Sequence, residues 1–224
     1  MRKLVVAASA AVAALALVAT ASADVLLPVN QTLQFNGAGG HLWNKFGGDS
    51  PYDANTRALR MNVGDPGAGE YVAAYSKRSL NIAKDAAAVG NLSFEFKATS
   101  YVGAGAPRIS VEFQNGDIAY LSASYCNHPM AATGNTWARA DFTRFHDNCS
   151  FFVSGETAGQ YLADGSKSAW RVYTDAHPDQ VVEQAYLVGD ETGVYRIDRL
   201  SLGAGVMYTS GNRVGKRCTT EASC

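Results

Sequence analysis

The chain has 224 residues, with 19 lysine and arginine side chains against 20 aspartate and glutamate side chains. This near-neutral balance argues against a nucleic-acid-binding protein, because such proteins carry a marked excess of positive charge. It also argues against a polybasic protein of a membrane surface. A chain of this length can bury one sizeable hydrophobic core, and β-sandwiches of about 200 residues commonly form one domain.

The first 23 residues have the pattern of a secretory signal peptide. Arg2 and Lys3 give a positive start, an apolar stretch runs from Leu4 to about Val18, and Ala21-Ser22-Ala23 is the small-residue pattern that signal peptidase recognises. The apolar stretch is short and rich in alanine for a membrane span, which needs about 20 strongly apolar residues. We therefore expect a secreted, extracellular protein that begins at Asp24 and does not span a membrane. A retained N-terminal anchor is the alternative.

Alternation of apolar and polar residues predicts the first strands of the remaining chain, because a half-buried strand repeats every two residues. Turns rich in Gly, Asp and Asn separate these strands, which are Leu33–Phe35, Leu59–Val63, Tyr71–Tyr75, Leu92–Lys97, Ile109–Phe113 and Ile118–Cys126. Asn115-Gly116 lies between the last two and predicts a hairpin.

The second half of the chain continues the same pattern. Its predicted strands are Trp137–Phe142, Phe151–Val153, Gln184–Val188 and Val194–Leu202. One short helix is predicted after Ser168, and it ends at His177-Pro178 because the residue before a proline is disfavoured in the α conformation. Many short strands with one short helix indicate an all-β protein, an antiparallel jelly-roll-like β-sandwich. We assign residues 24–203 to this domain and residues 204–224 to a surface tail.

The part of the chain after the signal peptide contains four cysteines: Cys126, Cys149, Cys218 and Cys224. An even number in an exported chain indicates disulfides, although four cysteines permit three pairings. We favour the first with the second and the third with the fourth, so that each disulfide closes a local loop and the second closes the tail. A metal site is the alternative, since His128 and His146 lie near the first pair. Their spacing differs from the tight motifs of zinc sites.

The last third of the chain resembles the closing section of secreted bacterial jelly-roll sandwiches, including carbohydrate-binding modules. The resemblance rests on Trp170-Arg-Val-Tyr173, on His177-Pro178, on a turn with Gly193, and on the strand Val194-Tyr-Arg-Ile-Asp198-Arg-Leu-Ser-Leu202-Gly203. It implies the fold rather than the ligand, because the same terminal strand occurs in sandwiches that bind no sugar. In several such modules the aspartate of this strand helps to hold a structural calcium, which Asp198 would do here. The alternative is an ion pair or a turn hydrogen bond of Asp198, with no cofactor.

Polar and aromatic side chains are predicted to share the sheet face that points away from the core. Such a mixture binds sugars, since rings stack on the apolar faces of pyranoses while carboxylates and arginines bind the hydroxyls. The candidates are Arg60, Glu95, Lys97, Arg108, Glu112, Trp137, Arg139 and Asp141, with Tyr71, Tyr75, Tyr120 and Tyr125 as additions. Trp43, in a glycine-flanked loop, is either a binding platform or a plug on the core. An ordinary solvated face with cross-strand ion pairs is the alternative to a binding face.

Catalytic residues are harder to assign. Glycoside hydrolysis needs two carboxylates about 5–9.5 Å apart, which Glu112 and Asp141, or Glu95 and Glu112, could supply across strands. A polysaccharide lyase would need a base such as Tyr120 or His128. Because no catalytic motif such as G-x-S-x-G is present, we expect a non-catalytic secreted protein that binds a polysaccharide or surface glycan. A polysaccharide hydrolase or lyase, and a structural or interaction protein of the cell envelope or matrix, are the alternatives.

Overall fold

The computed structural model describes residues 25–28, 33–37, 40–44, 58–76, 85–98, 105–126, 137–144, 149–156, 159–203 and 206–209. The predicted signal peptide, the candidate base His128, the side chain of Trp43 and the pair Cys218–Cys224 lie outside what is described. Within those ranges, no helix is long and apolar enough to cross a membrane.

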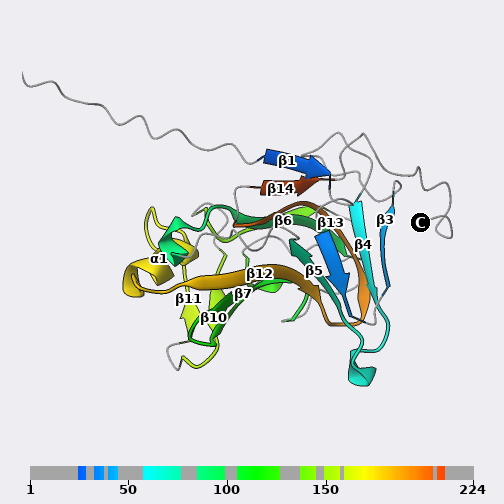
Figure 1. Ribbon diagram of the computed structural model, residues 1–224, viewed down its shortest axis with the longest axis horizontal. Coiled ribbons are helices and arrows are strands. Elements are labelled where there is room, and N and C mark those ends of the chain that lie inside the picture. Colours follow the sequence, from blue (N-terminus) through cyan, green and yellow to red (C-terminus); the bar gives the residue numbers. More distant parts are fainter. Residues whose placement is uncertain are drawn as a thin grey trace, which may run out of the picture.

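The strands form two sheets, one above the other in Figure 1. Sheet A contains β1 (Val25–Pro28), β3 (Gly40–Asn44), β4 (Ala58–Val63), β6 (Leu92–Ala98), β9 (Ala138–Asp141), β13 (Gly193–Leu202) and β14 (Val206–Thr209). Sheet B contains β2 (Leu33–Asn36), β5 (Val72–Ser76), β7 (Arg108–Phe113), β8 (Ile118–Ser122), β10 (Phe151–Val153), β11 (Gln160–Tyr161) and β12 (Val182–Gly189).

Eight of these strands pair in a nested order. In chain order they are β4, β5, β6, β7, β8, β9, β12 and β13. The first pairs with the last, the second with the seventh, the third with the sixth and the fourth with the fifth, always antiparallel. Sheet A thereby takes the order β4-β13-β6-β9 and sheet B the order β5-β12-β7-β8. This is the winding of a jelly roll, so the predicted fold class is confirmed.

The hydrophobic core lies between the two sheets, and the alternation along the strands is as predicted. Ile109, Val111 and Phe113 of β7 are at most 1% exposed, and Phe94 and Phe96 of β6 are fully buried. Each buried side chain of this size contributes about 1.5–3 kcal/mol to folding. The intervening residues of both strands therefore point to the outer face of their own sheet.

The predicted helix is present as α1 (Ala169–Ala176) and lies at one end of the sandwich (Figure 1). It begins where the hydroxyl of Ser168 accepts a hydrogen bond from the backbone N–H of Arg171 at 3.2 Å. It ends at His177, whose N–H donates to the carbonyl of Tyr173. Both ends match the sequence prediction.

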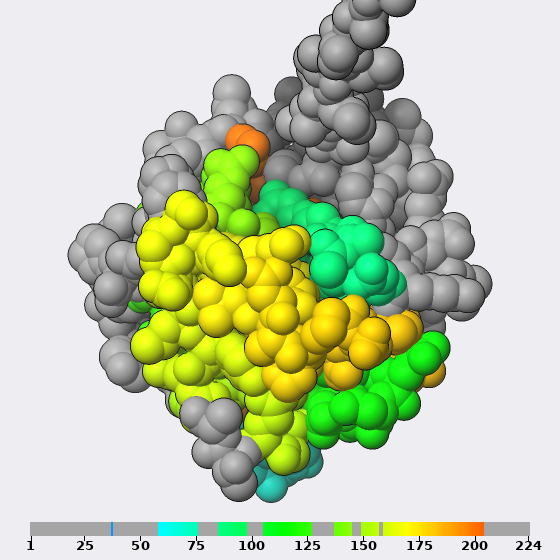
Figure 2. All heavy atoms as spheres, turned by 90° about the vertical axis from the view of Figure 1, so that its left-hand side faces the viewer, coloured from blue at the N-terminus to red at the C-terminus, as the bar shows by residue number. Residues whose placement is uncertain are grey.

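The helix covers the end of the core with aromatic side chains. Trp170 and Tyr173 pack on Phe113 and Phe151, with ring centroids 5.4–6.2 Å apart. The indole of Trp170 also donates to the carbonyl of Ala86 at 3.1 Å, in the short 3-10 turn η4 (Ala86–Ala88). Figure 2 looks at this end, where η4 and the helix lie side by side. The contact ties the helix to the segment that leads into β6.

The predicted turns differ in what they join. The Asn115-Gly116 turn forms a hairpin between β7 and β8, and Gly116 has φ +89°, which glycine adopts without steric cost. By contrast, the turn before Gly193 carries the chain from β12 in sheet B to β13 in sheet A. The second turn therefore forms a corner of the sandwich rather than a hairpin.

Four short strands were not predicted: β1, β3, β11 and β14. Strand β14 lies in the segment assigned to the tail, where it pairs with β13 at Leu200 and Ser201 and runs parallel to β1. Sheet A therefore extends to Thr209, beyond the predicted domain end at residue 203. These strands are fixed by their pairing with neighbours in the sheets, which the local pattern does not report.

Candidate functional site

The predicted sugar-binding residues lie on two opposite faces of the sandwich. Arg108, Glu112 and Tyr120 belong to sheet B, whereas Arg60, Trp137, Arg139 and Asp141 belong to sheet A or directly precede its strand β9. The expectation of one shared face is therefore wrong. Because a core about 10 Å thick separates packed sheets, Glu112 and Asp141 are not a facing catalytic pair.

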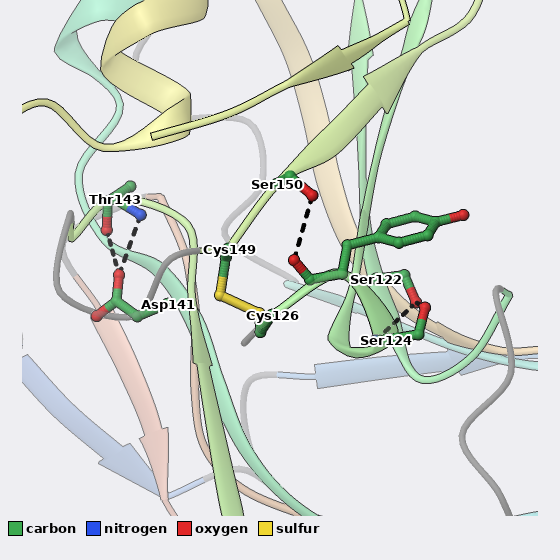
Figure 3. The surroundings of a disulfide bond; sticks show 8 residues. Ser122, Ser124, Cys126, Asp141, Thr143, Cys149 and Ser150 are labelled. Atoms are coloured by element: carbon green, nitrogen blue, oxygen red, sulfur yellow. Dashed lines mark hydrogen bonds between the residues drawn. A yellow bond between two sulfur atoms is a disulfide. The ribbon is translucent and has the colours of Figure 1, made fainter. Parts of the chain in front are cut away.

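On the sheet A side, Asp141 belongs to a buried polar network. It is fully buried and accepts from the Nη2 atom of Arg139 at 2.7 Å, while Arg144 lies 3.4 Å away. It also accepts from the backbone N–H and the hydroxyl of Thr143, which Figure 3 shows beside it. Trp137 is only 8% exposed. The polar side chains bind one another, and the indole of Trp137 is buried. Neither therefore offers an exposed ring face to a sugar.

Asp198 lies at an irregularity of β13. It is 1% exposed, and its Oδ1 accepts from the N–H of Arg199, which has φ +46°. The guanidinium of Arg199 in turn lies 3.4 Å from the buried carboxylate of Glu95. Among the described residues, no three or more His, Cys, Asp or Glu side chains are grouped as a metal site. The calcium role of Asp198 thus stays a prediction.

The predicted disulfide between Cys126 and Cys149 is present (Figure 3). Cys126 follows the 3-10 turn η5 (Ala123–Tyr125) at the end of β8, and Cys149 precedes β10. Ser150 N–H donates to the carbonyl of Tyr125 at 2.9 Å, directly beside the bond. The disulfide therefore fixes the start of β10 against β8, its neighbour in sheet B.

The outer face of sheet B carries aromatic side chains at one register position. Tyr186 pairs with Tyr75 on one side and with Ser110 on the other; Ser110 pairs with Tyr120, and Tyr120 with Phe152. In each strand these residues alternate with the buried ones, so their side chains point away from the core. We call Tyr75, Tyr186, Tyr120 and Phe152 the aromatic row. The row crosses the strands of sheet B instead of running along one of them.

Two rings of the aromatic row stack on each other beside a carboxylate. Tyr75 and Tyr186 have ring centroids 4.6 Å apart and planes inclined by 27°. Tyr186 donates its hydroxyl hydrogen to Glu112 at 2.8 Å, and the amide of Gln184 donates to the same carboxylate. Burial, followed by the hydrogen bond to Glu112, raises the pKa of Tyr186 well above its ordinary value. Burial and the neighbours Tyr71 and Glu112 also raise the pKa of Tyr75.

A two-point ion pair lies next to this stack. Arg108 holds Asp190 through Nη1 at 2.7 Å and Nη2 at 2.6 Å. The same guanidinium donates to the carbonyl of Gly105 and to the hydroxyl of Ser110, and it lies over the ring of Tyr120 at 5.6 Å. These contacts fix Arg108 flat against the sheet, where it fills the gap in the aromatic row at Ser110.

A hollow of about 500 Å³ opens between these groups and the chain that follows β4. We call it the sheet B hollow. Its lining residues are Pro66, Gly69, Glu70, Tyr71, Ala73, Tyr75, Arg108, Tyr186, Val188 and Asp190. Its volume lies in the range of small-molecule sites. The structure thus joins rings, carboxylates and hydroxyl groups around one concave surface.

Another group of polar side chains lies where α1 meets β11. Tyr161 donates its hydroxyl hydrogen to Glu156, and Nε2 of His177 lies 2.8 Å from the same hydroxyl oxygen. Burial and the carboxylate of Glu156 raise the pKa of Tyr161. A tyrosine with a raised pKa is a poor general base at neutral pH. This group therefore links the helix to sheet B.

Sequence reasoning found some of the residues around the hollow and missed others. Among the lining residues, Arg108, Tyr71 and Tyr75 were candidates, as were Glu112 and Tyr120 on the same sheet. Tyr186 and Gln184 were missed. The signal was available, because both lie in alternation with the buried residues of β12, Ala185 and Leu187. Their closeness to Glu112 depends on the strand order, which the sequence does not reveal.

Comparisons with known proteins identify no relatives: no family model, no curated protein and no solved structure matches this chain. The β-sandwich agrees with the fold that the resemblance of the last third implies. The narrower likeness to carbohydrate-binding modules belongs to the proposal below.

Proposed function

We propose that this protein is a secreted, non-catalytic carbohydrate-binding protein that holds its ligand on the outer face of sheet B. The observation that carries the proposal is the stack of Tyr75 on Tyr186 at the edge of the sheet B hollow, directly beside the Glu112 carboxylate. A ring surface next to fixed hydrogen-bonding groups is the combination that a pyranose requires, because its two faces are apolar and its rim carries hydroxyls.

The polar groups of the site are held in place before any ligand arrives. Glu112 is fixed by Gln184 and Tyr186, and Asp190 by Arg108. A carboxylate can accept about four hydrogen bonds, so each retains acceptor capacity for sugar hydroxyls. Such preorganisation lowers the entropic cost of binding.

A binding role is favoured over catalysis by the arrangement of the carboxylates. The hydrolase hypothesis paired Glu112 with Asp141 or with Glu95, and both of these partners belong to sheet A, whereas Glu112 belongs to sheet B. Asp141 is also fully buried among its own partners. A polysaccharide or a surface glycan is therefore the proposed partner, rather than a substrate.

Native affinity electrophoresis through gels that contain a panel of polysaccharides, with and without calcium, tests this function. We expect one or more polymers to retard the protein, and Tyr75→Ala and Tyr186→Ala to abolish the retardation. Lys97→Ala is the matched control, since Lys97 belongs to β6 of sheet A and points outward on the opposite face. Equal loss of retardation in all three variants, or retention in the two tyrosine variants, would refute binding at sheet B.

A further inference from the structure

The charges around the sheet B hollow are mainly negative. Glu70 and Asp190 line the hollow, and Glu112 lies against its lining residue Tyr186. Among the described residues that line the hollow, Arg108 is the one cation. Among the described residues, an anionic ligand would thus approach three carboxylates and one guanidinium.

The single cation is already neutralised. Both terminal nitrogens of Arg108 bind the carboxylate of Asp190, and further N–H groups donate to the Gly105 carbonyl and the Ser110 hydroxyl. Its side chain is 15% exposed. A sulfate or uronate group would have to displace a bidentate carboxylate, which is among the stronger hydrogen-bonded pairs in proteins. Arg108 is therefore a structural part of the site and not a receptor for an acidic group.

The hydrogen-bonding groups and rings of the site complement a neutral polyol. The carboxylates accept from sugar hydroxyls, and the hydroxyl of Tyr75 is a donor. The hydroxyl of Tyr186 gives its hydrogen to Glu112, so it serves a ligand only as an acceptor. The rings of the aromatic row supply apolar surface between these groups. None of these contacts requires a charge on the ligand.

The aromatic row also has a direction and a length. It runs from Tyr75 on β5 through β12, β7 and β8 to Phe152 on β10. Four strand spacings of about 4.8 Å give a span of roughly 19 Å. One strand spacing is close to the length of one linked pyranose unit, so the row accommodates about four units laid across the strands. Phe152, 37% exposed, lies at the far end.

We propose that the ligand of this face is an uncharged polysaccharide that lies across the strands of sheet B along the aromatic row, and that acidic polysaccharides are excluded. This inference rests on the proposed carbohydrate-binding function. It adds the chemical class of the ligand and the direction in which the chain lies.

Matched pairs of polymers test the charge. Hydroxyethyl cellulose is compared with carboxymethyl cellulose, fully methyl-esterified galacturonan with the free acid, and desulfated galactan with its sulfated form, at one ionic strength. We expect retardation by neutral members only. Retardation by acidic members to an equal or greater degree would overturn the inference while leaving carbohydrate binding intact. Retardation by no polymer would overturn both the inference and the proposed function.

Two variants test the physical reason for the exclusion. Asp190→Asn removes the counter-ion of Arg108, so the affinity for the acidic member of a pair should rise about two- to fivefold, as expected for an exposed charge pair. The new attraction between Arg108 and the acidic group of the ligand is screened by salt, so the gain in affinity should disappear in high salt. Glu112→Gln keeps the shape but removes a negative charge. Its amide oxygen accepts from Gln184, and its NH2 group donates to the Tyr186 oxygen in place of the hydrogen bond that Glu112 accepts there. It should shift selectivity in the same direction. No gain in either variant, with both folded, would show that charge does not set the selectivity.

A truncation tests the direction of the ligand. Phe152→Ala should lower the affinity for a polymer or a tetrasaccharide and leave binding of a disaccharide at the Tyr75 end unchanged. An equal loss of affinity for the tetrasaccharide and the disaccharide, or no loss for either, would overturn the placement of the ligand across the strands. Leu162→Ala, a substitution at another exposed residue near the same edge of sheet B, is the matched control.

Discussion

Tyr186 lies with its ring on that of Tyr75, at a centroid distance of 4.6 Å, although the two residues are separated by more than a hundred positions in the chain. The contact exists because β12 and β5 are neighbours in sheet B and pair these two residues directly. The stack therefore depends on the jelly-roll pairing of the second strand with the seventh.

Tyr186→Phe should separate the two roles of this side chain. The ring and its stack on Tyr75 remain, while Glu112 loses one of its two hydrogen-bond donors. We expect a decrease of about 1 kcal/mol in the free energy of unfolding and a partial loss of polysaccharide binding. Denaturant unfolding and affinity electrophoresis measure the two effects. Binding as weak as in Tyr186→Ala would show that the hydroxyl, rather than the ring, carries the affinity.

Alkaline pH should destabilise the protein through its buried tyrosines. Burial is the main cause that raises the pKa of Tyr161, Tyr173, Tyr186 and Tyr195 above the ordinary value of 10.0. The unfolded chain loses these protons near pH 10, whereas the folded protein keeps them to higher pH. The folded state then binds more protons, so the free energy of unfolding falls as the pH rises above 10.

Urea unfolding between pH 8 and pH 11, together with the ultraviolet absorbance of tyrosinate, measures this effect. Tyr173→Phe should make the alkaline decline shallower, because Tyr173 is 1% exposed and its ring contacts remain. Tyr71→Phe, at a residue 37% exposed, is the control and should leave the slope unchanged. A free energy of unfolding that stays constant to pH 11 would contradict the raised pKa of these tyrosines.

Removing the disulfide should cost stability. Cys126 and Cys149 are separated by 23 positions, and the chain-entropy model gives about 3 kcal/mol for a loop of this size. The double substitution of both cysteines by alanine should lower the free energy of unfolding by about that amount. Peptide mapping under non-reducing conditions checks the bond itself, and a peptide that links Cys126 to a different cysteine would contradict the structure.

Arg139 and Arg144 should differ in their effect, although both lie beside Asp141. Arg139 is 24% exposed and contacts the buried carboxylate at 2.7 Å, whereas Arg144 is 60% exposed and lies 3.4 Å away. Arg139→Ala should lower the free energy of unfolding by about 1.5–3 kcal/mol, and Arg144→Ala by less than about 1 kcal/mol. Thermal unfolding measures both. Neither change should affect polysaccharide binding. Loss of binding in a folded Arg139→Ala protein would show that the ligand binds on sheet A rather than on sheet B.

Local sequence patterns predicted the features that depend on residues close together in the chain. The alternation in Ile109–Phe113 identified a strand and the side of it that faces the core, because parity along a strand is fixed by backbone geometry. Ser168 and His177-Pro178 marked both ends of the helix, since capping and the proline effect act within a few residues. The pair Cys126–Cys149 was predicted from a short separation in the chain.

The same patterns failed where a contact depends on distant strands. Alternation showed that Glu112 and Asp141 point away from the core, but not that they do so on opposite faces. Strand β14 was missed because its pairing with β13 and β1 is contributed by the rest of sheet A. Tyr186 was missed as a site residue because its contacts with Tyr75 and Glu112 depend on the pairing of β12 with β5 and β7 in sheet B.

The sequence by itself determined ten of the strands, which side of each of them is apolar and where the helix begins and ends, because these depend on interactions between near neighbours. Only the tertiary structure decided to which sheet each strand belongs. That choice is made by burial between the two sheets and by backbone pairing over long separations. It placed Tyr75, Tyr186 and Arg108 around one hollow, with Glu112 bound to Tyr186, and left Arg139 and Asp141 as partners of each other on the far side.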